Sequence, residues 1–185
     1  MNGPTLYIVI AAIIIGLAGI AALMILARRK TERLQTQFGP EYARAIEEDG
    51  RRQGEAGLRD REKRVETFSI RPLTPNDRNR YAASWGKVQA QFVDDPNGSV
   101  TQADALLGDV MTTRGYPLGD FEQRSADISV DHPVVVENYR AGHDIAVRQG
   151  RGEAGTEDLR QAMLHYRILF EDLVGGAEIA PSQIP

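Results

Sequence analysis

The sequence predicts an all-α protein with an N-terminal transmembrane helix, a charged helical stalk and a four- to five-helix cytoplasmic bundle. Residues 2–27 contain no charged side chain, and several later stretches repeat apolar residues every three or four positions. No stretch after residue 27 shows the apolar–polar alternation of a strand. We therefore divide the chain into an anchor (1–27), a charged stalk or linker (28–70), a bundle domain (71–174) and a disordered tail (175–185).

The anchor is predicted from the apolar run Leu6–Leu26. As a helix, these 21 residues would be about 31 Å long, which matches the roughly 30 Å hydrocarbon core of a bilayer. A cleavable signal peptide is the alternative, but it carries its basic residues before a shorter core, whereas Arg28–Lys30 follow this run. Because basic residues beside a span stay cytoplasmic, we expect a single-pass inner-membrane protein with residues 1–5 outside and residues 28–185 in the cytoplasm. The reversed orientation stays open.

Small residues in the anchor offer a seam for a homodimer. Ala12 and Gly16 are four positions apart, as are Ala18 and Ala22, and Gly19 lies between the last two. Alternatively, these small residues face lipid and have no partner helix, because Gly and Ala are common in membrane helices whatever they face.

Charge and composition exclude several functions. Residues 28–71 hold 12 basic and 9 acidic side chains, whereas residues 72–185 hold 10 basic and 17 acidic ones. An acidic domain lacks the basic face that binds nucleic acid, while the basic stretch beside the anchor suits an anionic leaflet. The chain has no cysteine, which excludes disulfides, thiolate catalysis and cysteine-based metal sites.

The stalk is predicted to be helical but solvated and partly frayed. The anchor helix should continue into water until Gly39 and Pro40, and a new helix should start at Pro40. Three glycines, Gly50, Gly54 and Gly57, make the middle of this second helix the expected place for a bend. An intermolecular coiled coil is an alternative that the irregular apolar spacing does not favour.

Four amphipathic helices are predicted in the bundle, starting near Thr74, Asp95, Pro133 and Thr156, which are cap or first-turn residue types. Their apolar faces are Tyr81, Trp85, Val88 and Phe92; Val100, Ala103, Leu107, Val110 and Met111; Val135, Val136, Tyr139 and Ala146; and Leu159, Ala162, Met163, Tyr166, Leu169, Phe170 and Leu173. Each face needs a partner to cover it, which predicts a bundle. Between the second and third helices, we expect a short helix around residues 121–126 with loops on both sides.

Three strings carry a resemblance to a known group of proteins: IRPLTPNDRNRYAASWGKVQAQFVDD, MTTRGYPLGDFEQRSADISVDHPVVVENYR and TEDLRQAMLHYRILFEDL. With them, residues 28–174 resemble a family of uncharacterised bacterial proteins that have one N-terminal membrane helix. The resemblance implies the architecture above and brings no activity, cofactor or catalytic residue.

No motif predicts a catalytic residue, a cofactor or a metal. Asp127, Ser129 and Asp131 have the spacing of the first ligands of an EF-hand loop, but His132 stands where the loop needs Gly and Asn138 where it needs Glu. We therefore expect these acids to cap the following helix, with Ile128 and Val130 packed inward. A zinc site would have to combine His132, His143 and His165 from different helices, and no serine has the glycines of a nucleophile elbow.

The loop that leads into the short helix is the candidate partner-binding surface. Aromatic and charged residues gather there in sequence that is not expected to be helical, namely Arg114, Tyr116, Asp120, Phe121 and Arg124. In the alternative interpretation, Tyr116 and Phe121 plug the end of the bundle, and Arg114 or Arg124 pairs with Asp120 or Glu122.

The sequence therefore predicts a membrane-anchored protein-interaction or scaffold module with an unknown protein partner. One alternative is an enzyme or a metal- or ligand-binding domain that uses the acidic and histidine residues around positions 120–143. Another is an extracytoplasmic sensor, which requires the reversed orientation.

Overall fold

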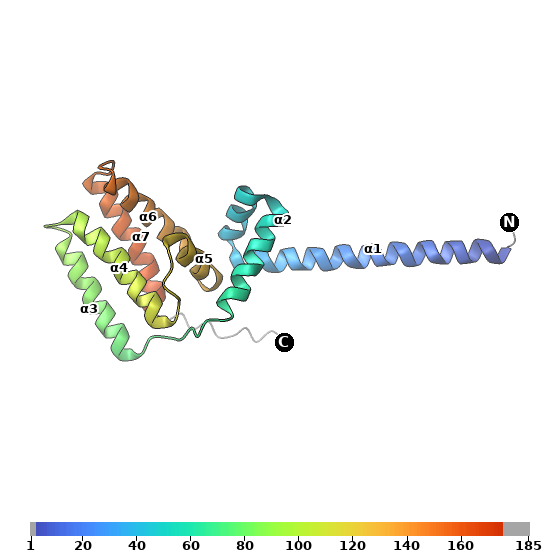
Figure 1. Cartoon of the computed structure of the whole chain (residues 1–185), viewed down its shortest axis with the longest axis horizontal. Helices are drawn as coiled ribbons and strands as arrows, with labels where there is room; N and C mark the ends of the chain where they lie inside the picture. The colour runs from blue at the N-terminus through green and yellow to red at the C-terminus, as the bar shows by residue number, and fades with distance from the viewer. Residues whose placement is uncertain (1–2, 176–185) are drawn as a thin grey trace.

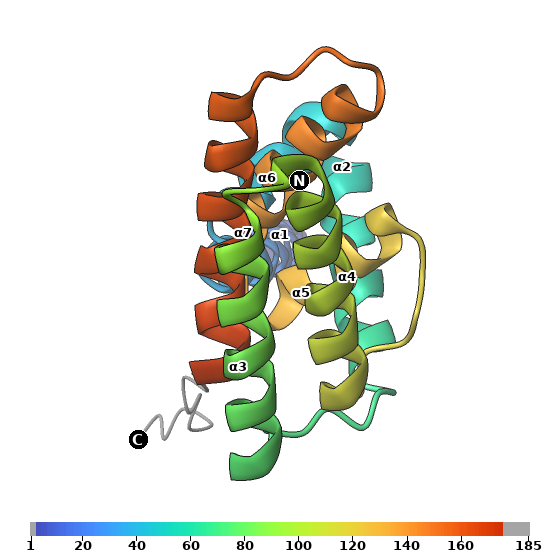
Figure 2. The same ribbon diagram turned by 90° about the vertical axis from the view of Figure 1, so that its left-hand side faces the viewer.

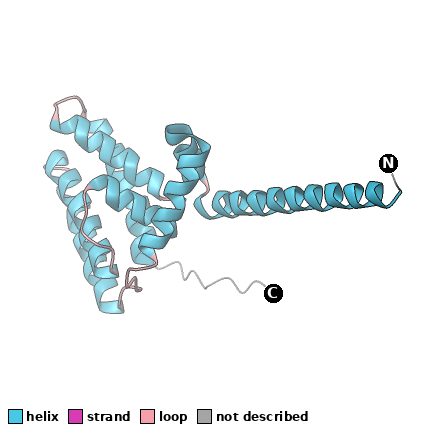
Figure 3. Ribbon diagram, turned by 45° about the vertical axis from the view of Figure 1, so that its right-hand side comes forward, coloured by secondary structure: helices cyan, strands magenta, loops and turns pink. Residues whose placement is uncertain are grey.

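The computed structural model describes residues 3–175 and shows, over that range, seven α-helices and no strand (Figures 1 and 3). For residues 3–10 and 12 it describes the backbone alone. The helices are α1 (Gly3–Phe38), α2 (Pro40–Val65), α3 (Pro75–Gln91), α4 (Pro96–Arg114), α5 (Phe121–Asp131), α6 (Val136–Gly150) and α7 (Thr156–Gly175). The all-α prediction is confirmed, whereas the predicted disordered tail begins at the last described residue and otherwise lies outside this range.

Helix α1 is a single rod of 36 residues that projects away from the rest of the chain (Figure 1). It ends where predicted, because Gly39 adopts a positive φ of 48° and Pro40 starts the next helix. Among residues whose side chains are described, no helix combines the length and the apolar character needed to cross a membrane. Residues 6–10 and 12 of the predicted span lie outside that set, and the transmembrane anchor stays a prediction.

Helix α2 is bent back on itself at Gly50, whose φ of 75° and ψ of 161° are not helical. The bend falls at one of the three predicted glycines. Gly54 then lets the two halves touch, because a Cβ atom there would lie 2.5 Å from the carbonyl oxygen of Ala45. The end of α1 and the two halves of α2 form a compact unit, which we call the stalk hairpin (residues 28–65).

A hydrogen-bond hub holds the stalk hairpin together. Glu55 accepts hydrogen bonds from Thr31 of α1 at 2.9 Å, from Tyr42 at 3.0 Å and from Arg51 at 3.2 Å. Burial raises the pKa of the Glu55 carboxyl, but these hydrogen bonds together hold it below its ordinary value. One carboxylate thus joins all three helical segments.

The stalk hairpin also has a small apolar core of its own. Leu34, Phe38, Ala45 and Leu58 are each at most 5% exposed and form a cluster separate from the main core. The predicted solvated and frayed stalk is therefore wrong: the apolar residues are sparse along the sequence, but the bend at Gly50 brings them together. This core gains one half-buried side chain from the bundle, Val130 of α5.

The bundle consists of α3 to α7, with α7 packed against α3, α4 and α6 (Figure 2). Helix α5 lies between α6 and the stalk hairpin, since it contacts both α6 and α2. Trp85 of α3 stacks on Phe170 of α7 with ring centroids 4.6 Å apart. The predicted apolar faces fill the core, apart from Phe92, Val135 and Ala146, which are half-buried at its edge.

Two of the predicted helix starts in the bundle, at Thr74 and Asp95, are confirmed by their caps, and α7 begins at Thr156 as expected. The predicted start at Pro133 is wrong, because residues 133–135 form a turn and α6 begins at Val136 without a side-chain cap. Thr74 accepts a hydrogen bond from the backbone N–H of Asp77, and Asp95 accepts one from Gly98. The predicted short helix is longer than expected, since α5 runs to Asp131.

Candidate functional site

The stalk hairpin meets the bundle along a polar seam. At its centre, Glu41 is buried at the start of α2 and accepts hydrogen bonds from Arg140 of α6, the shorter at 2.9 Å, and from Arg61 of α2 at 3.3 Å. Burial raises the pKa of the Glu41 carboxyl, against the opposing effect of Arg61 and Arg44. The cost of burying this charge therefore exceeds what those two arginines return.

The second part of the seam joins the end of α2 to α5. Arg64 donates from Nε to Oδ1 of Asp127 at 2.7 Å, and Gln123 donates to the same oxygen at 3.0 Å. Arg61 reaches Ser129 at 3.4 Å. Since Asp127 and Ser129 are both buried, the seam consists mainly of charged and polar groups taken out of water.

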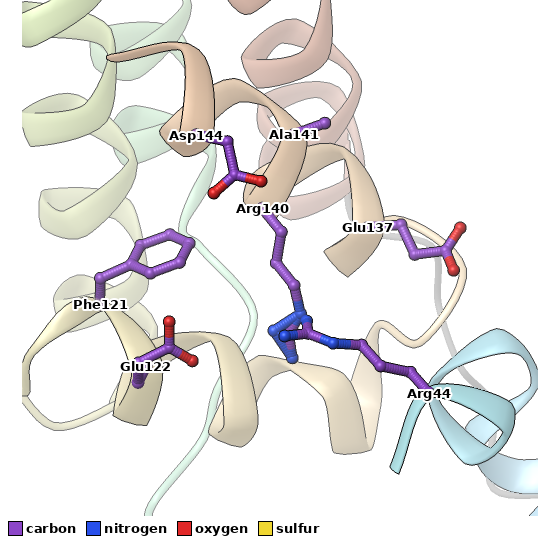
Figure 4. Close-up of a pocket in the computed structure, with 7 residues that line it drawn as sticks. All are labelled: Arg44, Phe121, Glu122, Glu137, Arg140, Ala141 and Asp144. Carbon is purple, nitrogen blue, oxygen red and sulfur yellow. The ribbon is translucent and has the colours of Figure 1, made fainter. Parts of the chain in front are cut away.

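A cavity of about 290 Å³ opens beside this seam (Figure 4). Arg44 from α2 forms one wall, while α5 and α6 supply the remaining lining residues, Phe121, Glu122, Glu137, Arg140, Ala141 and Asp144. Figure 4 shows the carboxylates of Glu122 and Asp144 directed toward the space in front of the Phe121 ring, whereas Glu137 points away. We call this space the junction cavity.

Among the described residues, the basic side chains around the junction cavity have ion-pair partners, whereas the acidic ones do not. Arg44 pairs with Glu48 at 2.7 Å, and Arg140 pairs with Glu41, which Arg61 also contacts, so each cation of the lining has an ion-pair partner. The Nη1 atoms of Arg44 and Arg140 are nevertheless buried without a hydrogen-bond partner within residues 3–175. The three carboxylates of the lining have no ion-pair partner in the described part of the chain. The cavity therefore presents unpaired negative charge to a ligand.

Phe121 adds an apolar wall to these carboxylates. One face of its ring stacks on the imidazole of His143, with centroids 3.5 Å apart and planes 7° from parallel. Tyr139 supports the same ring at a centroid distance of 4.9 Å. An aromatic ring held between carboxylates is a favourable environment for a cation with an apolar stem.

A second cavity, of about 470 Å³, lies on the other side of the start of α5 and shares Glu122 with the first. Its lining combines residues of α2 with residues of α5 and the segment before it: Gly57, Asp60, Arg61, Arg64, Asp120, Glu122, Gln123 and Ala126. Its arginines are again engaged in the seam, Arg61 with Glu41 and Arg64 with Asp127. Glu122 thus lines both cavities, and each cavity borders the stalk hairpin.

The predicted partner-binding loop is divided between surface and interior. Tyr116 is buried and its hydroxyl donates to Asp131 at 2.6 Å, while Arg114 donates to the carbonyl of Leu173 at 3.2 Å. Arg114 also lies 3.3 Å from Nε2 of His132. These two loop residues tie the end of α4 to α5 and α7. Tyr116 is buried, as the packing alternative expected, whereas Arg114 contacts Leu173 and His132 instead of the expected Asp120 or Glu122.

The other three loop residues belong to the start of α5. Asp120 caps the helix by accepting the N–H of Gln123, and it lines the second cavity. Arg124 turns inward, 3.6 Å from Asp104 of α4, rather than pairing with Asp120 or Glu122. Of the five predicted residues, Phe121 alone lines the junction cavity. The prediction that the loop binds a partner stays a prediction.

The residues considered for calcium lie on the helix α5 instead of a loop. Asp127 is used by Arg64, Asp131 by Tyr116, and Ser129 donates to the carbonyl of Ala126. Asp127 and Asp131 are four residues apart and share a side of the helix, but Ser129, two residues from each, does not, and each of the three side chains is bonded to a different partner.

The three histidines are also in separate environments. His132 contacts Asp172, His143 stacks on Phe121, and His165 contacts the side-chain oxygen of Asn138 at 2.9 Å. Over the described residues, no group of three or more acidic or histidine side chains is placed to hold a metal. None of the histidines lines either cavity.

Several residues of the seam and of the junction cavity were missed by the sequence analysis. Glu41, Arg44 and Arg140 read as ordinary charged positions on solvated helices, and Glu122 and Asp144 lie 22 residues apart in the chain. The position of Glu41 directly after Pro40 indicates an acidic first helical turn, which the helix dipole favours, but it does not indicate burial. Nothing in the sequence indicates that Arg140 would meet it.

The fold and the site define a class of protein: an all-α chain in which a five-helix bundle is docked on a helical hairpin at the base of a long apolar helix. Comparisons with known protein families, with curated proteins and with solved structures find no match to this chain.

Proposed function

We propose that this protein is a single-pass membrane protein whose cytoplasmic bundle binds a basic segment of a partner protein in the junction cavity. The observation that carries the proposal is the unpaired pair of carboxylates, Glu122 and Asp144, that faces this cavity beside Phe121. The proposal has two parts, the anchor and the binding site, which are tested separately.

The anchor is supported by the sequence and by the exposure of α1. The apolar run Leu6–Leu26 is long enough to span a bilayer. The large apolar side chains from Ile13 to Leu26 are between 52% and 72% exposed, so no segment among residues 3–175 covers them. A continuous apolar surface of this size is unstable in water and calls for lipid or another apolar partner.

The orientation is supported by Arg28, Arg29, Lys30 and Arg33, which follow the run directly. Because the chain lacks cysteine, single cysteines report topology without background. We expect Asn2→Cys to react in intact cells with a membrane-impermeant maleimide and Val93→Cys to react only after lysis. Labelling of Val93→Cys in intact cells would show that the orientation is the reverse of the one proposed. Release of the protein from membranes by alkaline carbonate would contradict the transmembrane anchor.

The binding site is supported by charge and shape. The two cations of the cavity are already paired, whereas its carboxylates are free, so a cationic group is the complementary ligand. A volume of about 290 Å³ is at the lower end of the range for small-ligand pockets and suits one long side chain, such as lysine or arginine. The aromatic wall favours the same choice.

The binding site is tested on the full chain in lipid nanodiscs by NMR titration with arginine amide, lysine amide and inorganic phosphate. The two cations should shift the signals of residues 121, 122 and 144 at millimolar concentration. Glu122→Gln with Asp144→Asn should abolish these shifts. The control, Asp94→Asn with Glu153→Gln, removes the same charge from exposed positions outside the cavity and should leave them intact.

Two outcomes contradict the binding site. Phosphate could shift these signals more strongly than the cations, which would make the cavity an anion site. The control variant could also lose the chemical-shift changes, which would mean that they arise from a non-specific effect of net charge.

A further inference from the structure

We propose that the seam between the stalk hairpin and the bundle is a releasable latch, and that the bundle swings away from the hairpin when the seam opens. The latch goes beyond the proposed function. Only its last step, the effect on the junction cavity, rests on that function.

The two parts joined by the seam are each internally complete. The stalk hairpin has its own core and the Glu55 hub, and the bundle core is formed by residues 68–174 without any stalk side chain. Val130 is the one bundle residue packed on the core of the hairpin among the described residues. Each part therefore keeps its main apolar contacts when they separate.

The contacts that hold the two parts together are mostly ionic. Glu41 with Arg140 and Arg64 with Asp127 place two carboxylates, 1% and 2% exposed, next to partly solvated guanidinium groups. Buried ion pairs give back little net free energy, because removing both charges from water costs nearly as much as the pairing returns. A polar interface of this kind is typical of domains that move relative to each other.

The chain provides a hinge at one place. Beyond Val65 the helix ends in a turn in which Glu66 and Thr67 are exposed, and this turn is held by backbone hydrogen bonds to the last turn of α2, with no contact from the bundle among its described backbone bonds. From Phe68 onward the connection belongs to the bundle: Arg71 donates its N–H to the carbonyl of Arg114 at 2.8 Å, and Leu73 is buried in the main core. The bend is therefore expected at Glu66 and Thr67.

Opening of the latch would dismantle the junction cavity, since one of its walls is Arg44 of the hairpin and the others are bundle residues. A ligand that needs both walls binds the closed state better and shifts the population toward it. The seam would thus couple the orientation of the bundle at the membrane to occupancy of the cavity.

The latch is tested by distance measurements between spin labels on the full chain in nanodiscs. The labels are attached at Glu48→Cys on the hairpin and Val134→Cys on the bundle, both exposed positions. The reference pair, Val93→Cys and Val134→Cys, lies within the bundle. Arg64→Glu with Arg140→Glu should open the seam by placing like charges against Asp127 and Glu41. We expect the first distance to lengthen and broaden, with the reference distance unchanged.

The control is Lys63→Glu with Arg148→Glu, which makes the same charge change on the same two helices at exposed positions outside the seam. It should behave as the wild type. An unchanged first distance in the seam variant overturns the latch. Simultaneous broadening of the reference distance also overturns it, because the two parts would then unfold as one.

Hydrogen exchange of the seam variant tests whether the two parts stay folded when they separate. Backbone amides of residues 40–65 and of α7 should keep the protection that they have in the wild type, because opening of the seam leaves the helical hydrogen bonds of both parts in place. Loss of protection in either segment would mean local unfolding instead of opening and would contradict the latch. Failure of the cation titration alone would leave both of these readouts intact, so the two proposals are separable.

Discussion

Glu41 and Arg140 are 99 residues apart in the chain and form an ion pair of 2.9 Å between the first turn of α2 and the middle of α6. The pair fixes where the stalk hairpin lies against the bundle. Arg140 also lines the junction cavity, so one contact shapes both the seam and the candidate site.

The coupling of this pair is measurable by a double-mutant cycle. We expect Arg140→Gln to lower the free energy of unfolding by about 1–3 kcal/mol more when Glu41 is present than in a Glu41→Gln background. The reason is that Arg140→Gln removes one of the two direct cationic partners of the buried Glu41 carboxylate. The free energies of unfolding of the four proteins in urea give the coupling. Additive effects would mean that the pair does not form in solution. Arg44→Gln, which breaks an exposed pair with Glu48, should cost less than about 1 kcal/mol.

Close packing of α6 on α7 depends on Gly142. A Cβ atom at this position would lie 2.6 Å from the ring of Tyr166, so Gly142→Ala must push the two helices apart. We expect a loss of about 1–3 kcal/mol in thermal or urea unfolding. Gly86→Ala in α3 is the matched control. Nothing lies within 4 Å of its Cβ position, so the change should stabilise the protein by up to about 1 kcal/mol through helix propensity. If Gly142→Ala also stabilises, the helices are not in contact as described.

The charge state of His143 should make stability depend on pH. Burial lowers the pKa of this imidazole, with Asp104 and Asp144 opposing the effect and Arg124 adding to it. A lowered pKa means that the folded state prefers the neutral ring. This contribution is therefore complete above the ordinary pKa of 6.5 and is lost as the pH falls through the lower folded value.

The free energy of unfolding between pH 7.5 and pH 5, taken together with an NMR titration of His143, checks this expectation. His143→Gln should flatten the dependence over that range. A folded pKa above 6.5 would reverse the sign and contradict the assignment.

Arg124 distinguishes recognition from packing in the predicted loop. Its guanidinium lies 3.6 Å from Asp104 and 5.8 Å from the ring centroid of Tyr139, and its side chain is 16% exposed. Arg124→Glu would place a second carboxylate beside Asp104, so we expect the protein to lose about 2–4 kcal/mol of stability. Arg80→Glu, at a position that is 61% exposed, should cost less than about 1 kcal/mol. An unchanged melting temperature for Arg124→Glu would favour the role in recognition.

The positions of the bundle helices were predictable because their signals are local. The caps at Thr74 and Asp95 and the glycine stop at Gly115 act within one turn of the chain. The apolar spacing on α7 was long enough to identify seven of its eight buried residues, and only Val174 in the last turn was not predicted. The candidate site was not predictable to the same extent, since the sequence analysis named Phe121 but neither Glu122 with Asp144 nor Arg140 as its partners.

The sequence by itself determined the all-α class, the starts of α3, α4 and α7 and the uncharged run at the N-terminus, because periodicity, capping and hydrophobicity depend on neighbours a few residues apart. The tertiary structure decided that the stalk folds back at Gly50, that Glu41 meets Arg140 and that α5 extends to Asp131. These features depend on side chains that are tens of residues apart and on the exchange of hydration for packing and pairing. Contacts between such distant side chains leave no repeating pattern in the sequence. They are determined only by how the helices are arranged in space.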